Sequence, residues 1–160
     1  MIEKIVSGGQ TGADRGAIDA AFDCGFPYGG FIPKGRLAED GRIDSKYTAL
    51  VELDSFDYFE RTKKNIEQSD GTVVIFCKKY GAGTKATIDY ASYLKKPLLV
   101  VNLSECEQKE AVTLIDSFAR ENNIAVLNVA GPRESIDSGI YKKVYEIVKE
   151  LILLQKGKAP

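Results

Sequence analysis

Short apolar runs alternate with amphipathic stretches along most of the chain. The apolar runs have the length of strands, and they are residues 2–6, 28–32, 72–77, 97–102 and 124–129. Residues 50–53 are expected to add a small edge strand. Between the runs, apolar residues recur at helical spacing, which predicts helices over residues 15–24, 57–69, 84–94, 104–121 and 140–154.

Strands that alternate with helices indicate βαβ units and a parallel sheet. We therefore expect an α/β fold, a three-layer, doubly wound, Rossmann-like sandwich with right-handed crossovers. With the five main strands numbered along the chain, the expected order is 2-1-3-4-5. The winding then reverses between the first and third strands, where ligands bind outside the carboxyl ends of such strands. The length fits one domain over residues 1–154, followed by a tail at 155–160.

A glycine-rich turn over residues 7–12 follows the first strand and leads into the first helix. Gly8 and Gly9 would let the backbone turn sharply and come close to a ligand. Thr11 and Asp14 form a T-x-x-D pattern that resembles a capping box. Because the start of a helix favours an anion, this turn predicts an anion-binding loop. An ordinary βα turn is the alternative, since the turn lacks the spacing of the dinucleotide fingerprint.

A second glycine-rich turn, residues 81–84, follows the third main strand. In the expected topology the two turns face each other across one crevice, and Arg15, Lys34, Arg36 and Lys85 are the cations expected around it. The second turn is not a Walker A loop, because Thr84 precedes Lys85. The alternative for this turn is a plain connection with solvated lysines.

Three polar residues of the second helix, Arg61, Asn65 and Ser69, recur at steps of four and share one stripe. Asn65 and Ser69 are expected to donate hydrogen bonds to the ligand from the side, although a solvated helix face is the alternative. Arg133 follows the last strand, so it lies on the ligand side of the sheet, where a solvated charge is again the alternative.

The composition narrows the classes of function. The net charge of -1 provides no basic field for nucleic acid, and the absence of histidine removes the commonest general base and metal ligand. The three cysteines lie far apart without a zinc pattern, which indicates reduced thiols in a cytoplasmic protein. We see neither a signal peptide nor an apolar run of membrane-spanning length. No catalytic or metal-ligating residue is predicted.

Several of these motifs resemble the signature of the family named putative molybdenum carrier proteins. The matching segments are residues 8–17, 33–41, 61–65, 69–70, 81–84 and 128–135. The resemblance implies a Rossmann-like fold related to the molybdenum cofactor carrier proteins, which are oligomeric, and more distantly to the lysine-decarboxylase-like nucleotide phosphoribohydrolases. The ligand it implies is molybdenum cofactor (molybdopterin), a pterin with a phosphate and a molybdenum oxo group, or a free oxyanion.

The distant hydrolases carry a catalytic glutamate at the position where this chain has Thr87. A threonine cannot act as a general base near neutral pH, so hydrolysis by their mechanism is not expected. The alternative function is nevertheless a hydrolase acting on a nucleotide or a nucleotide-derived substrate, with Glu39 or Asp40 of the 33–48 loop as its base. A third possibility is a ligand-sensing module.

The expected function is a cytoplasmic binding or carrier protein for an anionic, nucleotide-like or pterin ligand. A homo-oligomer, either a dimer or a tetramer, is expected, with molybdoenzymes as possible partners and with no binding to nucleic acid or membrane. The residues expected to hold the ligand are Gly8, Gly9, Gln10, Thr11, Gly12, Arg15, Lys34, Arg36, Asn65, Ser69, Gly81, Gly83, Thr84, Lys85 and Arg133.

Overall fold

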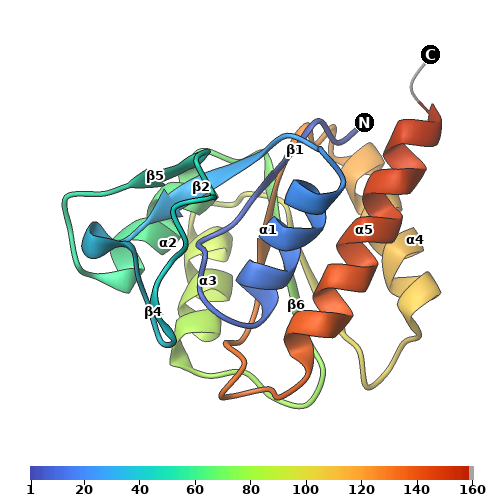
Figure 1. Cartoon of the computed structure of the whole chain (residues 1–160). Helices are drawn as coiled ribbons and strands as arrows, with labels where there is room; N and C mark the ends of the chain where they lie inside the picture. The colour runs from blue at the N-terminus through green and yellow to red at the C-terminus, as the bar shows by residue number, and fades with distance from the viewer. Residues whose placement is uncertain (159–160) are drawn as a thin grey trace.

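The computed structural model describes residues 1–158 and shows helices packed on both faces of a central sheet (Figure 1). The strands are β1 (Lys4–Val6), β2 (Tyr28–Ile32), β3 (Leu37–Ala38), β4 (Gly41–Arg42), β5 (Leu50–Glu52), β6 (Gly71–Phe76), β7 (Leu98–Asn102) and β8 (Val126–Ala130). The helices are α1 (Ala13–Asp23), α2 (Tyr58–Glu67), α3 (Ala82–Tyr93), α4 (Gln108–Glu121) and α5 (Ile140–Lys158), with a short 3-10 turn at Lys34–Arg36. The predicted α/β class and the expected edge strand β5 are confirmed.

The central sheet has six parallel strands in the order β5-β2-β1-β8-β6-β7. In the numbering of the five main strands this order is 2-1-5-3-4, so the expected order 2-1-3-4-5 is wrong. The last strand pairs with β1 on one side and β6 on the other, instead of standing at the edge. The loops after β1, β6 and β8 therefore meet at one edge of the sheet, with the β8 loop in the middle.

One face of the sheet is covered by α1, α4 and α5, and the other by α2 and α3 (Figure 1). The strand β6 is buried on both faces, as its continuous apolar run predicted. Helices α1 and α5 pack closely because α1 presents small residues. A Cβ added at Gly16 would lie 2.5 Å from the carbonyl oxygen of Tyr141 on α5. This close packing fixes the start of α1 relative to the loop after β8.

The segment between β2 and β5, expected to be a long loop, is an ordered arm. It contains the 3-10 turn and an antiparallel hairpin of β3 and β4. Arg36 holds the arm together by donating hydrogen bonds to the carbonyl oxygens of Ile43 and Asp44, at 3.0 and 2.8 Å. Ile43 and Tyr47 anchor it in a small second core beneath α1.

Capping patterns precede two helices, Thr11–Asp14 before α1 and Ser104–Glu107 before α4, and neither forms a capping box. Helix α1 begins after Gly12, and the Asp14 carboxylate accepts a hydrogen bond from the Gln10 amide at 3.3 Å, so no T-x-x-D box is made in this part of the described chain. Helix α4 has Glu107 as its N-cap, while Ser104 bonds to the Asn102 side chain. In both cases the local pattern is present, but the N-cap is a later residue: Gly12 instead of Thr11 in α1, and Glu107 instead of Ser104 in α4.

Helix α5 continues to Lys158, although we expected a tail from Gln155 onward. Gln155 is buried, accepts a hydrogen bond from the Ile2 amide at 3.1 Å and donates one to Asp116 at 2.8 Å. The last two residues of the expected tail, 159–160, lie outside the described residues. The bond to Ile2 places the N-terminal strand and the end of α5 side by side (Figure 1).

Candidate ligand-binding cleft

A cleft of about 660 Å³ opens at the carboxyl ends of β6 and β8, between the starts of α2 and α3. This volume lies within the range of about 300–1,000 Å³ that is usual for sites of small ligands. Its lining combines the two glycine-rich turns with the loop after β8: Gln10, Asp14, Tyr58, Arg61, Thr62, Gly81, Gly83, Thr84, Thr87, Gly131, Arg133, Ser135 and Ile136 are among the lining residues.

The start of α3 faces this cleft. Its N-cap, Gly81, contributes no capping side chain among the described residues, and Gly83 and Thr84 of the first turn line the cleft. The first N–H groups of a helix lack partners inside the helix, and together with the dipole they favour an anion. A Cβ at Gly81 would come within 2.8 Å of Ile136 Cδ1, so a larger residue there would require the Ile136 side chain of the β8 loop to shift.

A buried ion pair forms the inner wall of the cleft. Arg61 Nη1 lies 3.4 Å from Asp14 Oδ2, and the two side chains are only 13% and 5% exposed. Burial raises the pKa of Asp14 above its usual value, although the charge of Arg61 and the hydrogen bond from the Gln10 amide act in the opposite direction. A Cβ at Gly8 would overlap the Arg61 guanidinium, so Gly8 makes room for the pair.

Gln10 lies beside this pair and is 5% exposed. Its Oε1 accepts hydrogen bonds from the amides of Thr11 and Glu39, at 3.0 and 2.8 Å. Its Nε2 is buried and has no hydrogen-bond partner among residues 1–158, and the same holds for Arg61 Nε. Two buried donors at the cleft are thus unpaired.

Arg133 and Tyr58 line the outer part of the cleft. The Arg133 guanidinium carbon lies 5.6 Å from the centre of the Tyr58 ring, and that of Arg61 lies 5.7 Å from it. Arg133 Nη1 is also 3.7 Å from Glu39 Oε2 of the hairpin. Tyr58 therefore lies against both guanidinium groups of the cleft, and Glu39 balances the charge of one of them.

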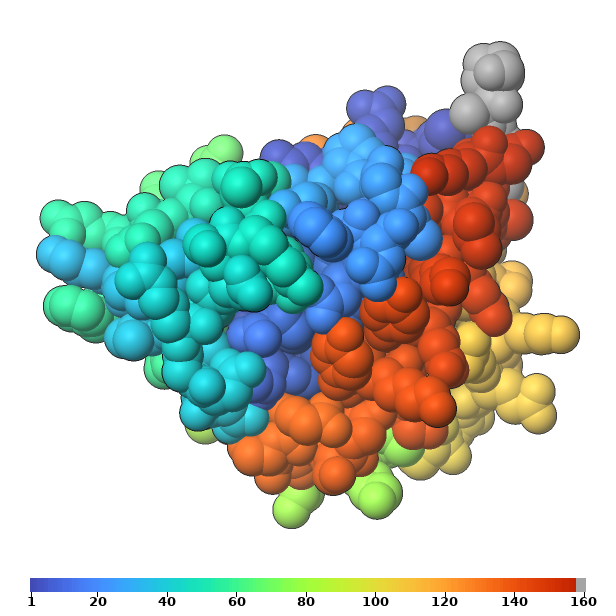
Figure 2. Space-filling view, in the orientation of Figure 1, coloured from blue at the N-terminus to red at the C-terminus, as the bar shows by residue number. Residues whose placement is uncertain are grey.

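Glu39 joins the hairpin to both neighbouring loops. Its carboxylate accepts hydrogen bonds from Thr11 Oγ1, from the Ser135 amide at 3.2 Å and from Ser135 Oγ at 2.6 Å. Partial burial raises its pKa, but these hydrogen bonds and the charge of Arg133 outweigh that effect and hold the pKa below its ordinary value of 4.5. Figure 2 shows the hairpin, in cyan, against the orange surface of the β8 loop.

Part of the first glycine-rich turn lies away from the cleft. Thr11, Gly12 and Arg15 line a second cavity of about 330 Å³, together with Asp40 and Tyr141. Arg15 donates two hydrogen bonds to the Gly9 carbonyl oxygen and pairs with Asp40 at 3.2 Å. Arg15 therefore lies beside the start of α1 with partners inside the protein, and its contact with a ligand stays a prediction.

Some backbone amides in that turn and just after it are bonded within the protein. The Gln10 amide bonds to Asp14, the Thr11 amide to the Gln10 side chain and the Ala13 amide to the Pro132 carbonyl oxygen at 3.1 Å. Gly9 packs against apolar side chains, and Gly12 has a φ of +77° and lies against the β8 loop. Of the residues in this turn, Gln10 is the one that lines the cleft.

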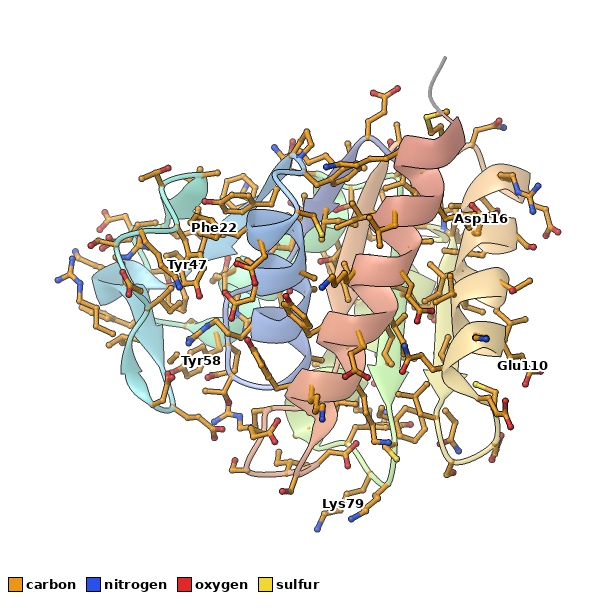
Figure 3. All side chains as sticks on the ribbon, turned by 45° about the vertical axis from the view of Figure 1, so that its right-hand side comes forward. Phe22, Tyr47, Tyr58, Lys79, Glu110 and Asp116 are labelled. Atoms are coloured by element: carbon orange, nitrogen blue, oxygen red, sulfur yellow. The ribbon has the colours of Figure 1, made fainter. Side chains whose placement is uncertain are left out.

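Three of the expected cations lie outside the cleft. Lys34 pairs with Asp54 at 2.8 Å on the arm, Arg36 binds carbonyl oxygens there, and Lys85 pairs with Asp89 at 2.6 Å on the exposed side of α3. Lys79, which precedes the second glycine-rich turn in the sequence, extends away from the lower edge of the molecule (Figure 3). Lys34 and Lys85 thus have carboxylate partners and Arg36 has carbonyl partners, which sequence order alone did not reveal.

Asn65 and Ser69 are buried but serve the framework. The Asn65 side chain accepts a hydrogen bond from the Phe31 amide at 2.8 Å and donates one to the Phe31 carbonyl oxygen at 3.0 Å. Ser69 Oγ donates to the Asn65 carbonyl oxygen. Asn65 thus fastens α2 to the edge of β2, and only the third member of the polar stripe, Arg61, reaches the cleft.

The structure adds Tyr58, Arg61, Asp14 and Thr87 to the lining that we expected. The polar stripe on α2 was the signal for Arg61, whereas the capping interpretation of Asp14 hid its role in the ion pair. No sequence pattern pointed to Tyr58. Within the described part of the chain, no cluster of three or more cysteine, aspartate or glutamate side chains is arranged to hold a metal ion.

Residues 5–152 match the family described as the circularly permutated YpsA SLOG family. This chain belongs to that family. None of the curated proteins with which the sequence was compared matches it. A solved structure, the putative molybdenum carrier protein from Syntrophus aciditrophicus SB, is 44% identical, with a TM-score of 0.90 over 94% of this chain and 95% of that chain. The expected resemblance to molybdenum carrier proteins is thereby confirmed.

A circular permutation explains the strand order of this SLOG-family chain. If β8 is counted first, the main strands read 3-2-1-4-5 across the sheet, which is the usual Rossmann order, with β5 added at the edge. The adjacent ends of the chain, linked by the Ile2–Gln155 hydrogen bond, suit such a rearrangement. The loop after β8, which carries Arg133, then takes the central place of the first loop in an unpermuted sheet.

Proposed function

We propose that the protein is a binding or carrier protein for a small anionic ligand of nucleotide-like or pterin character. Molybdenum cofactor, or a related phosphate-bearing compound or oxyanion, is the named candidate, because a relative 44% identical is described as a putative molybdenum carrier protein. The observation that supports the proposal most is the cleft of about 660 Å³, which is lined by both the start of α3 and the Arg133 side chain. Its neutral and cationic donors suit oxyanions.

Molybdenum cofactor is cargo in this proposal, so its pterin and phosphate must be held without being consumed. The first turn of α3, at Gly83 and Thr84, would hold the phosphate, with Arg133 neutralising its charge from the opposite side. Gln10 would line the deeper part of the cleft. The remaining residues of our expected set, such as Lys34 and Arg36, support the surrounding structure instead.

Binding is tested by calorimetric titration with ribose 5-phosphate and with a reduced pterin phosphate. Replacing Arg133 with alanine should weaken both ligands about tenfold, because a charge-assisted hydrogen bond is lost. Lys85→Ala is the matched control, since Lys85 is also a cation near the start of α3 but pairs with Asp89 outside the cleft. Equal affinities in the wild-type protein and the Arg133 variant would refute the proposed binding mode.

Native mass spectrometry with metal analysis, on protein purified from its own cells, would identify the bound cargo. The same spectrum reports the number of subunits, which tests the expected dimer or tetramer, and co-purified molybdoenzymes would reveal delivery partners. The hydrolase alternative predicts free base and ribose phosphate released from nucleoside monophosphates. It also predicts that Glu39→Gln abolishes that release, although Glu39 here is bonded to Thr11 and Ser135.

Within residues 1–158, no helix combines the length and the apolar character that crossing a bilayer requires. The cytoplasmic location remains a prediction, which a fractionation of the producing cells would test.

A further inference from the structure

Strand β7 is an open edge of the central sheet. It stands last in the order β5-β2-β1-β8-β6-β7 and pairs with β6. We infer that this edge is an interface with a second copy of the chain, in which the two β7 strands pair antiparallel across a twofold axis at Val100. The described residues that line the cleft include none from β7 or α4, so the inference is independent of the proposed ligand.

The outward-facing backbone groups of β7 belong to Leu98 and Val100. The Thr72 amide of β6 donates to the Pro97 carbonyl oxygen at 2.9 Å, so the odd-numbered positions of this segment bond to β6. Because the hydrogen bonds of a ladder alternate along each strand, the amide and carbonyl groups of Leu98 and Val100 turn away from the sheet. Such groups are a template on which a further strand can pair.

The side chains of this edge are apolar and partly exposed. The strand reads Leu-Leu-Val-Val-Asn and carries no charged residue, although natural proteins usually protect an open edge with charges. Val100 is 43% exposed, whereas Val74, its partner on β6, is fully buried. Pairing with another strand would cover both the apolar side chain and the open backbone groups.

Helix α4 packs on β7 and extends the apolar surface of this edge. Asp116 of α4 accepts a hydrogen bond from Gln155 of α5, so that side of α4 faces α5. Because each helical residue advances by about 100°, Leu114, two positions earlier in the chain, lies on the opposite flank. In Figure 1 α4 is the outermost helix beyond α5. Leu114, which is as exposed as Val100, therefore lies beside the open edge.

The charges at the two ends of β7 are opposite, which favours a second copy of the chain as the partner. Lys95 precedes the strand and Glu105 follows it, both are exposed, and each is five positions from Val100. An antiparallel pair centred on Val100 brings Lys95 of each copy toward Glu105 of the other, whereas a parallel pair brings like charges together. In the antiparallel register the two Val100 residues exchange their outward backbone hydrogen bonds.

Sedimentation velocity of the full chain, over a series of concentrations, tests this interface. We expect the wild-type protein to form a dimer, or a tetramer that contains this dimer. In Val100→Lys two like charges meet at the twofold axis, so the dissociation constant should rise about 100-fold or more. Val51→Lys is the matched control, because Val51 is 52% exposed on β5, the edge strand at the other end of the sheet, and it should leave association unchanged.

A charge swap tests the antiparallel register. Glu105→Lys places a cation opposite Lys95 at both ends of the paired strands, so the dissociation constant should rise about fivefold or more. Adding Lys95→Glu restores opposite charges and should return the constant to the wild-type value. Both positions are exposed, so the swap decides the inference even if Val100→Lys fails to fold.

The possible outcomes separate this interface from other modes of association. A wild-type protein that stays monomeric at the highest concentration overturns the inference, and so does an oligomer that Val100→Lys leaves intact while its melt stays cooperative. A charge variant without effect, or a loss that the double variant does not reverse, overturns the register. Calorimetry with ribose 5-phosphate tests the proposed function separately, and folded Val100→Lys should bind that ligand as the wild-type protein does.

Discussion

The buried pair of Asp14 and Arg61 offers the sharpest test of how the cleft is built. We consider Arg61→Met, which keeps most of the side-chain volume and removes the charge. The variant leaves the Asp14 carboxylate, which is only 5% exposed, without its cation. Removing one partner of a buried pair typically costs about 3–5 kcal/mol, because the other charge stays buried and uncompensated. We expect a loss of that size in the free energy of unfolding at neutral pH.

The pairwise part of this loss can be estimated separately. At 3.4 Å, Coulomb's law with an effective dielectric constant of 20 gives an attraction of about 5 kcal/mol. Desolvation of the two groups offsets much of it, so a coupling of about 2 kcal/mol is expected from a double-mutant cycle with Asp14→Asn. Asp14→Asn alone should cost less than Arg61→Met, because ionised Asp14 is itself destabilised by burial.

The loss of stability caused by Arg61→Met should also depend on pH. Since the pKa of Asp14 is raised in the folded protein, its contribution is most favourable below its unfolded value of 3.8 and is lost as the pH rises through the folded pKa. The penalty of Arg61→Met should accordingly be smallest in acid and should grow toward neutral pH, because only ionised Asp14 needs a partner.

Urea unfolding followed by circular dichroism measures all four proteins of the cycle at pH 7, with equal m-values as the condition for comparison. Asp89→Asn, which breaks the exposed pair with Lys85, is the control and should leave the urea midpoint unchanged. A coupling below about 0.5 kcal/mol would mean that Asp14 and Arg61 act independently, which would refute this account of the inner wall.

Three further substitutions test the parts that support the site. Glu39→Gln should lower the free energy of unfolding at pH 7. The pKa of Glu39 is depressed in the folded protein, so its carboxylate stabilises the fold above about pH 4.5 and loses this contribution as the pH falls. The difference between the two proteins should therefore shrink in acid, which urea midpoints at pH 7 and pH 3 would check. Asn65→Ala should cost about 1–3 kcal/mol in a thermal melt, because both backbone groups of Phe31 lose their partner. Gly30→Ala should prevent stable folding, as judged by loss of the cooperative melt, because Gly30 has a φ of +135° and an added Cβ would overlap the Ser7 carbonyl oxygen.

The elements themselves were largely predictable, because periodicity is a local property. The continuous run that forms β6 and the helical spacing of α1 and α5 are visible in the sequence, and their ends shifted by only a few residues. The position of β8 was not visible, since its apolar residues would suit an edge or a central place equally. Only pairing with both β1 and β6 distinguishes these places, and that depends on residues more than fifty positions away.

The part of the candidate site that is formed by the backbone was predictable from the sequence. The turn at Gly81 was placed at the cleft because strand, glycine and helix follow one another directly. Cations were harder, because their partners come from distant segments: Lys34 meets Asp54, and Arg15 meets Asp40. In the sequence, a cationic side chain that pairs with a distant carboxylate looks the same as one that is free to bind a ligand.

The segment of residues 33–41 contributes to the cleft in an unexpected manner. We expected Lys34 and Arg36 of this segment to hold the ligand, yet both side chains bind other parts of the arm. The contribution of the hairpin comes from Glu39, whose amide fixes the Gln10 side chain and whose carboxylate lies against Arg133 and bonds to Ser135. The hairpin therefore holds the Gln10 side chain of the inner cleft and the Arg133 side chain of the outer cleft in one network. A ligand that contacts both ends of the cleft would depend on this network. Changes at Glu39 should therefore alter the binding of the phosphate and of the ring of the ligand together.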